Sequence, residues 1–261
     1  MEAVPAVWDD PAQDWAPRYD LVVIRSTWDY PDRRDEFLRW ADSLPYVLNP
    51  ADVLRWNTHK QYLEYLGMDA IPSRFVAPGE PFAPPEAEFV VKPAVGVGSI
   101  GAARYDPGDE RATAHVAELH ASGKTVLVQP YLEAVDEEGE TALMYVADEF
   151  SHAVRKEPLL AAGAAPGAGL YLEERLAGTE PAADQLALAE RALDALPFPR
   201  SSLLYARIDM LPGPVVLEVE LTEPSLFIGY AEDAPERFAD AIVAASQRRR
   251  MSDENGPTTS Q

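Results

Sequence analysis

The sequence has no cysteine, few cations and no long apolar run. Without cysteine, disulfide bonds, thiolate zinc sites and cysteine nucleophiles are excluded, so any metal ion must be bound by oxygen or imidazole. No apolar stretch approaches the roughly 20 residues that span a bilayer, and we expect no membrane span. The first residues show neither the basic start nor the apolar core of a secretory signal, which predicts a cytoplasmic protein.

Positive charge is scarce along the whole chain. Lysine and arginine number 22 against 44 aspartate and glutamate residues, a formal net charge of -22. Such a charge repels polyanions and argues against nucleic-acid binding over a broad surface. A small anionic ligand would therefore need a local group of cations. Only four lysines could supply it: Lys60, Lys92, Lys124 and Lys156.

The N-terminal part predicts a small parallel sheet. Residues 21–25 have the pattern of a buried strand, residues 32–44 have helical spacing, and "YVLNP" predicts a second strand. In this β-loop-α-β order, ligands collect beyond the carboxyl ends of the strands. The residues at that position are predicted to bind the substrate, with a well-packed turn as the alternative: Arg25, Ser26, Thr27, Trp28, Asp29 and Tyr30.

The rest of the chain predicts a mixed α/β (α+β) fold. We expect, in order, a helix at 58–66, a strand, a glycine loop and a strand from residue 88, a helix at 110–122, a strand at 124–132, a hairpin at 142–156, a mobile loop at 159–169, a helix at 181–196, a hairpin at 205–221, a helix at 235–249 and a disordered tail at 251–261.

The stretch "FVVKPAVGVGSIGAARY" contains a G-x-G-x-x-G formed by Gly96, Gly98 and Gly101. Missing β-carbons let backbone N–H groups approach a phosphate closely. A dinucleotide fold needs this motif to open a helix, whereas here a short strand follows, so the loop joins two antiparallel strands. Protein kinases also use such a hairpin, but the H-R-D and D-F-G triplets are absent. A flexible turn without a ligand is the alternative.

A second hairpin, "YARIDMLPGPVVLEVELTEPS", alternates around Gly213 and places Asp209 opposite Glu218 and Arg207 opposite Glu220. Three carboxylates on one face repel one another, which indicates a bound Mg²⁺ or Mn²⁺. A solvated charged face is the alternative. The apolar residues are expected to point the other way, into a core: Ile208, Met210, Leu217, Val219 and Leu221.

Taken in order, these segments resemble the ATP-grasp superfamily of carboxylate ligases over most of the chain. "WNTHKQYLEYLGMDAIPS" resembles the segment with the first ATP lysine, Lys60, and "FVVKPAVGVGSIG" the segment with the second, Lys92, and the phosphate loop. "LVQPYL" resembles the hinge that meets adenine. "ARIDM" and "LEVEL" resemble the metal segment, which implies Asp209 and Glu218 as Mg²⁺ ligands and Arg207 as the cation that steadies the transferring phosphoryl group.

The resemblance implies roles for further residues. Glu220 stands where many members have asparagine, and it can still bind a metal through oxygen. Lys156, which shares a strand face with His152, is predicted to approach the acyl phosphate or substrate, with a structural role as the alternative. Nucleotide contacts are expected from the loop, the hinge and an acidic turn: Gly96, Gly98, Ser99, Gly101, Gln129, Tyr131, Leu132 and Glu140.

More narrowly, "VVIRSTWDYPDRRDEFLRW", "SHAVRK" and "LTEPSLF" resemble a branch that contains an O-ureidoserine cyclo-ligase. Members begin with a further strand and helix, so we expect a truncated N-terminal domain (1–56), a central ATP-grasp subdomain (57–130) and a C-terminal subdomain with the metal site (131–250). The resemblance implies that ATP activates a small amino-acid-like carboxylate as an acyl phosphate, which an amine attacks, in an intramolecular reaction. A two-substrate amide ligase and a non-catalytic ATP-binding protein are the alternatives, and homo-oligomerisation stays open.

Overall fold

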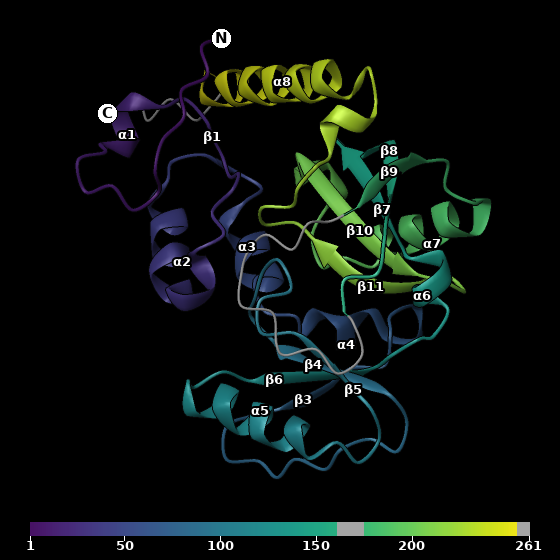
Figure 1. The fold of residues 1–261 in the computed structure, drawn as a ribbon. Coiled ribbons are helices and arrows are strands. Elements are labelled where there is room, and N and C mark those ends of the chain that lie inside the picture. Colours follow the sequence, from purple (N-terminus) through teal and green to yellow (C-terminus); the bar gives the residue numbers. More distant parts are fainter. Residues whose placement is uncertain (161–174, 255–261) are drawn as a thin grey trace.

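The computed structural model describes residues 1–160 and 175–254. In this part of the chain the strands form three sheets, of two, four and five strands, which follow one another along the sequence (Figure 1). Their strands fall within residues 1–56, 57–130 and 131–250 respectively. The two larger sheets lie in different parts of the molecule, and the space between them is where the site is found (Figure 1).

The N-terminal segment folds as the predicted β-loop-α-β unit. Strand β1 (Val22–Val23) pairs in parallel with β2 (Val47–Leu48), and α2 (Arg34–Ser43) connects them. On α2, Phe37 and Ala41 recur at helical spacing and are buried in a cluster with several aromatic rings. The small parallel sheet is therefore confirmed. Two short helices precede and follow the unit in the chain: α1 (Trp15–Arg18) and α3 (Ala51–Asn57).

The four-stranded sheet is antiparallel and has the order β3-β6-β4-β5. Its strands are β3 (Arg74–Val76), β4 (Phe89–Pro93), β5 (Ala103–Tyr105) and β6 (Val126–Pro130). Helix α5 (Glu110–Ala121) covers one face, and Asp109 caps it by accepting a hydrogen bond from the Arg111 amide. The glycine loop joins β4 to β5, so the predicted antiparallel hairpin is confirmed.

The five-stranded sheet has the order β11-β10-β7-β8-β9 and helices on both faces (Figure 1). Its strands are β7 (Glu140–Val146), β8 (Glu149–Lys156), β9 (Leu176–Thr179), β10 (Tyr205–Leu211) and β11 (Val215–Glu220). Successive side chains alternate between faces, so β7 directs Leu143 into the core shared with α7 (Ala183–Asp194) and Met144 into the core shared with α8 (Ala234–Glu254). Burial on both faces explains the nearly continuous apolar character of β7.

The hairpin of β10 and β11 has the predicted register at its charged end. Asp209 pairs with Glu218 and Arg207 pairs with Glu220. The register then shifts, so that Met210 pairs with Val216 and Leu217 is the extra residue of a bulge. The prediction that Leu217 points into the main core is therefore wrong. Its side chain lines the cavity instead, in a small apolar cluster with Leu211.

Other element boundaries differ from the predictions. The helix expected at 58–66 is a turn followed by α4 (Tyr62–Leu66), which ends at Gly67 with a positive φ. Strand β9 was not predicted. Most of the loop expected at 159–169 lies outside the described residues. Helix α8 continues to Glu254, so the tail predicted to be disordered from residue 251 is helical over its first four residues.

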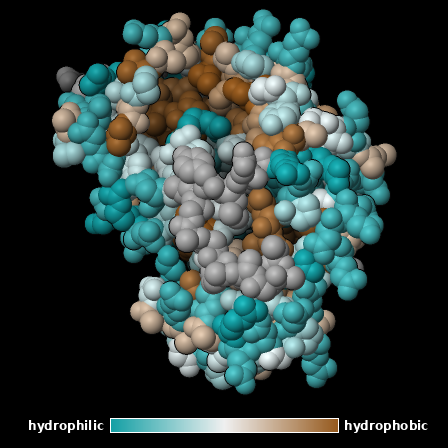
Figure 2. Space-filling view, viewed as in Figure 1, coloured by the Kyte–Doolittle hydropathy of each residue, from teal (hydrophilic) through white to brown (hydrophobic). Residues whose placement is uncertain are grey.

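The surface is largely polar on the face shown in Figure 2, with apolar side chains gathered in the upper part of the view near α8. None of the helices in the described ranges is long and apolar enough to cross a membrane. The cations that an anionic ligand needs are found inside the molecule, in the cavity between the larger sheets.

Candidate active site

A cavity of about 340 Å³ lies between the four-stranded and five-stranded sheets, with β4 and β6 on one side and β10 and β11 on the other. Most predicted site residues line it: Trp28, Tyr30, Lys60, Lys92, Gly96, Gly98, Ser99, Gln129, Tyr131, Leu132, Glu140, Lys156, Arg207, Asp209, Glu218 and Glu220. The remaining predicted residues do not: Arg25, Ser26, Thr27, Asp29 and Gly101. The structure thus brings together the metal residues, the nucleotide residues except Gly101, and two of the six substrate residues.

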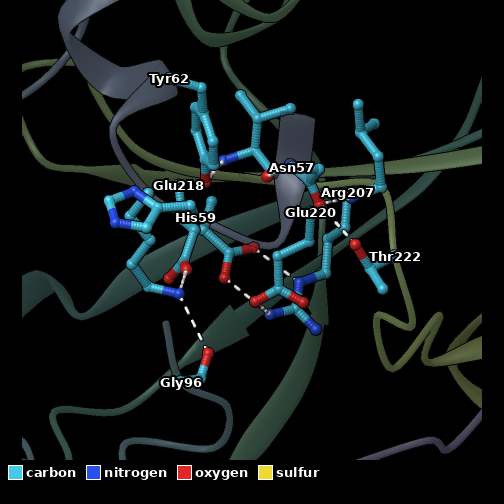
Figure 3. A network of polar contacts seen from close by, with 12 residues as sticks. Asn57, His59, Tyr62, Gly96, Arg207, Glu218, Glu220 and Thr222 are labelled. Atoms are coloured by element: carbon cyan, nitrogen blue, oxygen red, sulfur yellow. Dashed lines mark hydrogen bonds and ion pairs between the residues drawn. The ribbon is translucent and has the colours of Figure 1, made fainter. Parts of the chain in front are cut away.

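The two predicted ATP lysines differ in their partners. Lys60 Nζ donates a hydrogen bond to the Gly96 carbonyl oxygen at 3.1 Å and forms an ion pair with Glu218 (Figure 3). Although burial opposes it, this carboxylate raises the pKa of Lys60. Lys92 has no hydrogen bond or ion pair to any side chain within residues 1–160 and 175–254, and burial lowers its pKa. A phosphate group in the cavity would supply the anion that Lys92 lacks.

Asp209 is the centre of a buried network and is only 2% exposed. Its carboxylate accepts hydrogen bonds from Arg207 Nε and Nη2 and from Lys156 Nζ, each at 2.8 Å. Lys156 also pairs with Glu140 at 2.8 Å, and Arg207 with Glu220 at 2.5 Å. Burial alone would raise the pKa of Asp209, but the two cations hold it well below its ordinary range. Asp209 is therefore ionised at neutral pH.

Carboxylates outnumber cations around the cavity. The acidic groups are Glu140, Asp209, Glu218, Glu220 and Glu223, and the basic groups are Lys60, Lys92, Lys156 and Arg207. Burial raises the pKa of Glu220 to about 7, with Arg207 opposing the shift and neighbouring carboxylates adding to it. Burial and repulsion from Glu220 raise the pKa of Glu223 to about 8. The site thus has an excess of acidic groups that additional cations would relieve.

The donor chemistry fits a divalent cation. Asp209 and Glu218 face each other across the β10–β11 pair, and their ligand atoms are all oxygen, which suits Mg²⁺. In the described ranges no three acidic or histidine side chains converge closely enough to enclose a metal ion by themselves. Mg²⁺ commonly takes one or two carboxylates plus substrate phosphates. Asp209 and Glu218 would accordingly hold it together with phosphate oxygens rather than in a closed protein site.

The hinge after β6 is clamped from outside the cavity. The Tyr131 amide donates to the Glu88 carbonyl oxygen at 2.9 Å, and its hydroxyl donates to Asp136 Oδ1 at 2.6 Å. The guanidinium carbon of Arg104 lies 3.5 Å from the centre of the Tyr131 ring. Arg104 is held there by Glu88 at 2.9 Å and Asp136 at 2.9 Å. Apolar side chains complete the adjacent wall where an adenine ring could pack: Ile71, Leu132, Val135, Leu211 and Leu217.

The predicted substrate residues take two directions from the end of β1. Trp28 and Tyr30 line the main cavity. Arg25 and Thr27 line a second cavity of about 100 Å³ within the N-terminal region. In the described part of the chain, Arg25 Nη1 and Thr27 Oγ1 are buried without a hydrogen-bond partner. Asp29 accepts a hydrogen bond from Trp8 Nε1 at 2.9 Å and forms an ion pair with Arg33.

Two contributors near the site were not predicted. Asn57, the last residue of α3, accepts hydrogen bonds from the Leu221 amide at 2.8 Å and from Thr222 Oγ1 at 3.1 Å, and it donates to the Val219 carbonyl oxygen at 2.6 Å (Figure 3). It thereby fixes the chain where β11 ends. Glu223 follows and lines the cavity. No sequence pattern marks Asn57, but an acid three residues after Glu220 could have drawn attention to Glu223.

Comparison with solved structures defines the class of protein. The chain is similar to the crystal structure of D-alanine-D-alanine ligase from Bacillus anthracis complexed with ATP, with a TM-score of 0.61 and 16% identity over 90% of this chain and 81% of that chain. At this identity the likeness shows the fold alone. The protein has the mixed α/β fold of the ATP-grasp proteins, and the predicted fold class is confirmed.

Closer relatives define the family. The chain is 38% identical to the cycloserine biosynthesis protein DcsG of Streptomyces lavendulae, over 90% of this chain and 86% of the relative. The crystal structure of D-cycloserine synthetase DcsG matches with a TM-score of 0.77 and 33% identity over 93% of this chain and 88% of that chain. Residues 1–49 match the family model of the N-terminal domain of D-cycloserine synthetase DcsG. The chain therefore belongs to the DcsG family, and the predicted branch is confirmed.

Proposed function

We propose that the protein is an ATP- and Mg²⁺-dependent ligase that activates the carboxylate of a small amino-acid-like substrate. The observation that carries this proposal is the arrangement around one cavity: a glycine loop and Lys92, which has no ion-pair partner among the described residues, lie opposite a cluster of carboxylates and Arg207. Lys92 would bind a nucleotide phosphate, and Asp209 and Glu218 offer the oxygen ligands that Mg²⁺ prefers. The fold shared with a ligase complexed with ATP supports the nucleotide assignment.

The reaction has two steps. An oxygen of the substrate carboxylate attacks the γ-phosphorus of ATP, the bond to ADP breaks, and an acyl phosphate forms. A nitrogen then attacks the acyl carbon, the bond from that carbon to the phosphate oxygen breaks, phosphate leaves, and the nitrogen gives up one proton. Arg207 would stabilise negative charge on the transferring group and on the tetrahedral intermediate. A bound Mg²⁺ would neutralise charge on the triphosphate.

The family supports a nitrogen from the same molecule as the nucleophile. The two relatives carry the names cycloserine biosynthesis protein and D-cycloserine synthetase, and cycloserine is a ring. We therefore place ring closure within one substrate ahead of the joining of two molecules, and O-ureidoserine is the first compound to test.

The test is ADP release by the wild-type protein with ATP and Mg²⁺, in the presence of O-ureido-D-serine or O-ureido-L-serine. ADP release with one enantiomer and no other amine is the expected result. ADP release only after a second amine is added would identify a two-substrate ligase. Binding of ATP, measured by calorimetry, with no ADP release for any substrate would identify a non-catalytic nucleotide-binding protein and overturn the proposal.

A further inference from the structure

Glu223 is a buried acidic residue that lines the cavity and has no ion-pair partner in the part of the chain that the structure describes. Glu223 is 8% exposed and follows β11 in the chain, where it lines the cavity. Within residues 1–160 and 175–254, no side chain or amide donates a hydrogen bond to its carboxylate or forms an ion pair with it. Three cations are near enough for their charges to interact with it. Lys60 pairs with Glu218, and Arg207 pairs with Asp209 and Glu220. Arg25 lines the second cavity and forms no ion pair with Glu223 in the described residues. An enclosed carboxylate in this state is costly unless a ligand brings a positive group to it.

The segment that carries Glu223 is fixed at several points. Thr222 is held by Asn57, and the Tyr205 hydroxyl lies 2.8 Å from the Thr222 carbonyl oxygen. Arg207 Nη1 donates to the Ser225 carbonyl oxygen at 3.2 Å. His152 Nε2 lies 2.9 Å from the Leu226 carbonyl oxygen and 3.2 Å from that of Phe227. A carboxylate on so constrained a segment is positioned before any ligand arrives, which lowers the cost of binding.

The neighbours of Glu223 place it on the substrate side of the cavity. Trp28 and Tyr30, from the N-terminal segment, line the same cavity. Burial raises the pKa of the Tyr30 phenol, and the charge of Glu223 adds to the shift. Aromatic rings and a carboxylate that line one cavity can together attract an ammonium group. The negative phosphates of ATP would be repelled by Glu223 and attracted by Lys92 on the opposite sheet. With Mg²⁺ assigned to Asp209 and Glu218, the other substrate is the remaining ligand that could bring a cation to Glu223.

We propose that Glu223 binds a non-reacting ammonium group of the carboxylate substrate and so restricts the substrate to amine-bearing carboxylates such as α-amino acids. The inference rests on the proposed function for the identity of the second ligand. Its test can nevertheless be separated from turnover, since the ammonium contact is made on binding.

The experiment is calorimetry on protein saturated with Mg²⁺ and a non-hydrolysable ATP analogue. Matched ligands differ only in the amino group: O-ureidoserine against 3-(ureidooxy)propanoate, and serine against 3-hydroxypropanoate, with both enantiomers of each amino acid. The variants are Glu223→Gln and, as a control, the same substitution at exposed Glu232. We expect wild type and Glu232→Gln to prefer an amine-bearing ligand by about 10- to 100-fold, the size of a charge-assisted hydrogen bond. In Glu223→Gln the preference should fall to about 1, with affinity for the ATP analogue unchanged.

Three outcomes would overturn the assignment: no preference for amine-bearing ligands in wild type, binding of no ligand in any pair, or a preference that survives in Glu223→Gln. Loss of stability in Glu223→Gln with the preference intact would show instead that Glu223 serves a structural partner such as the nearby Arg25. A preference that depends on Glu223 in a protein that releases no ADP would retain the ammonium site and refute the ligase activity. ADP release by a protein whose preference for amine-bearing ligands is unchanged in Glu223→Gln would support the ligase activity and refute the ammonium site.

Discussion

Asparagine in place of Asp209 removes one buried negative charge and leaves the size of the side chain unchanged. Asp209 accepts three hydrogen bonds of 2.8 Å from Arg207 and Lys156. Breaking a buried ion pair typically costs about 3–5 kcal/mol, because the partner stays charged and buried. Here each cation keeps one other carboxylate, Glu220 or Glu140, so the lower end applies. We expect Asp209→Asn to lose about 3 kcal/mol of unfolding free energy, or about 6 to 12 °C in melting temperature.

The loss should depend on pH in a defined direction. The folded protein holds the pKa of Asp209 below its ordinary range, since Arg207 and Lys156 outweigh the effect of burial. The carboxylate therefore contributes its full stabilisation above the unfolded-state pKa of about 4, and the contribution disappears as the pH falls further. The difference in stability between wild type and Asp209→Asn should be present in full at about pH 5 to 6, below the pKa of about 7 of Glu220, which Asp209 helps to raise. It should shrink below about pH 4.

Urea unfolding followed by circular dichroism measures both effects. The matched control is Asp240→Asn, the same substitution on the exposed surface of α8, which should change the unfolding free energy by less than about 0.5 kcal/mol. If Asp209→Asn proved no more destabilising than the control, or if the difference grew on acidification, the buried network would not be held together as described.

Three further predictions concern individual residues. Lys92→Met should lower ATP affinity about 10- to 100-fold in calorimetry without loss of stability, because Lys92 has no partner among the described residues. The control Lys124→Met, which removes a surface ion pair, should bind ATP normally. Equal losses of ATP affinity in the two variants would contradict the assignment. Glu223→Gln should stabilise the ligand-free protein, and the gain in unfolding free energy should be larger at pH 9 than at pH 6 by up to about 3 kcal/mol. The reason is that a carboxyl group whose pKa is raised on folding destabilises the folded state as it ionises. A gain that does not change with pH in urea unfolding would refute this. Gly139→Ala should destabilise by more than about 3 kcal/mol, because a β-carbon there would lie 2.2 Å from a backbone oxygen of β8, whereas Gly108→Ala, with a similar φ and open space, should cost only about 1–2 kcal/mol.

Local patterns predicted much of the fold. The register of the β10–β11 hairpin follows from strict alternation around a turn at Gly213, whose φ of 92° suits glycine. The glycine loop was placed between antiparallel strands because no helix pattern follows it. The bulge at Leu217 could not be foreseen, since one extra residue in a strand leaves the apolar pattern almost unchanged while it reverses the face of that side chain.

In the candidate site, too, residues in local motifs were predicted and residues positioned by long-range contacts were missed. Residues inside local motifs, such as Lys92 and Asp209, were predicted as site residues from their spacing, their residue type and the family resemblance, and both line the cavity. Asn57 was missed because its contacts join parts of the chain far apart in sequence, such as the 164 residues between Asn57 and Leu221. Long-range packing also explains why only two of the six predicted substrate residues line the main cavity. The strand end was located correctly, but the direction of each side chain depends on packing against other elements.

The central claim is that ATP activates a substrate carboxylate, and isotope transfer tests it most directly. O-ureidoserine labelled with ¹⁸O in both carboxylate oxygens would be incubated with the protein, ATP and Mg²⁺, and the released phosphate analysed by mass spectrometry. In an acyl phosphate the oxygen between carbon and phosphorus comes from the carboxylate and leaves with phosphate. The account predicts one ¹⁸O atom in each phosphate released. Release of unlabelled phosphate during turnover would contradict it.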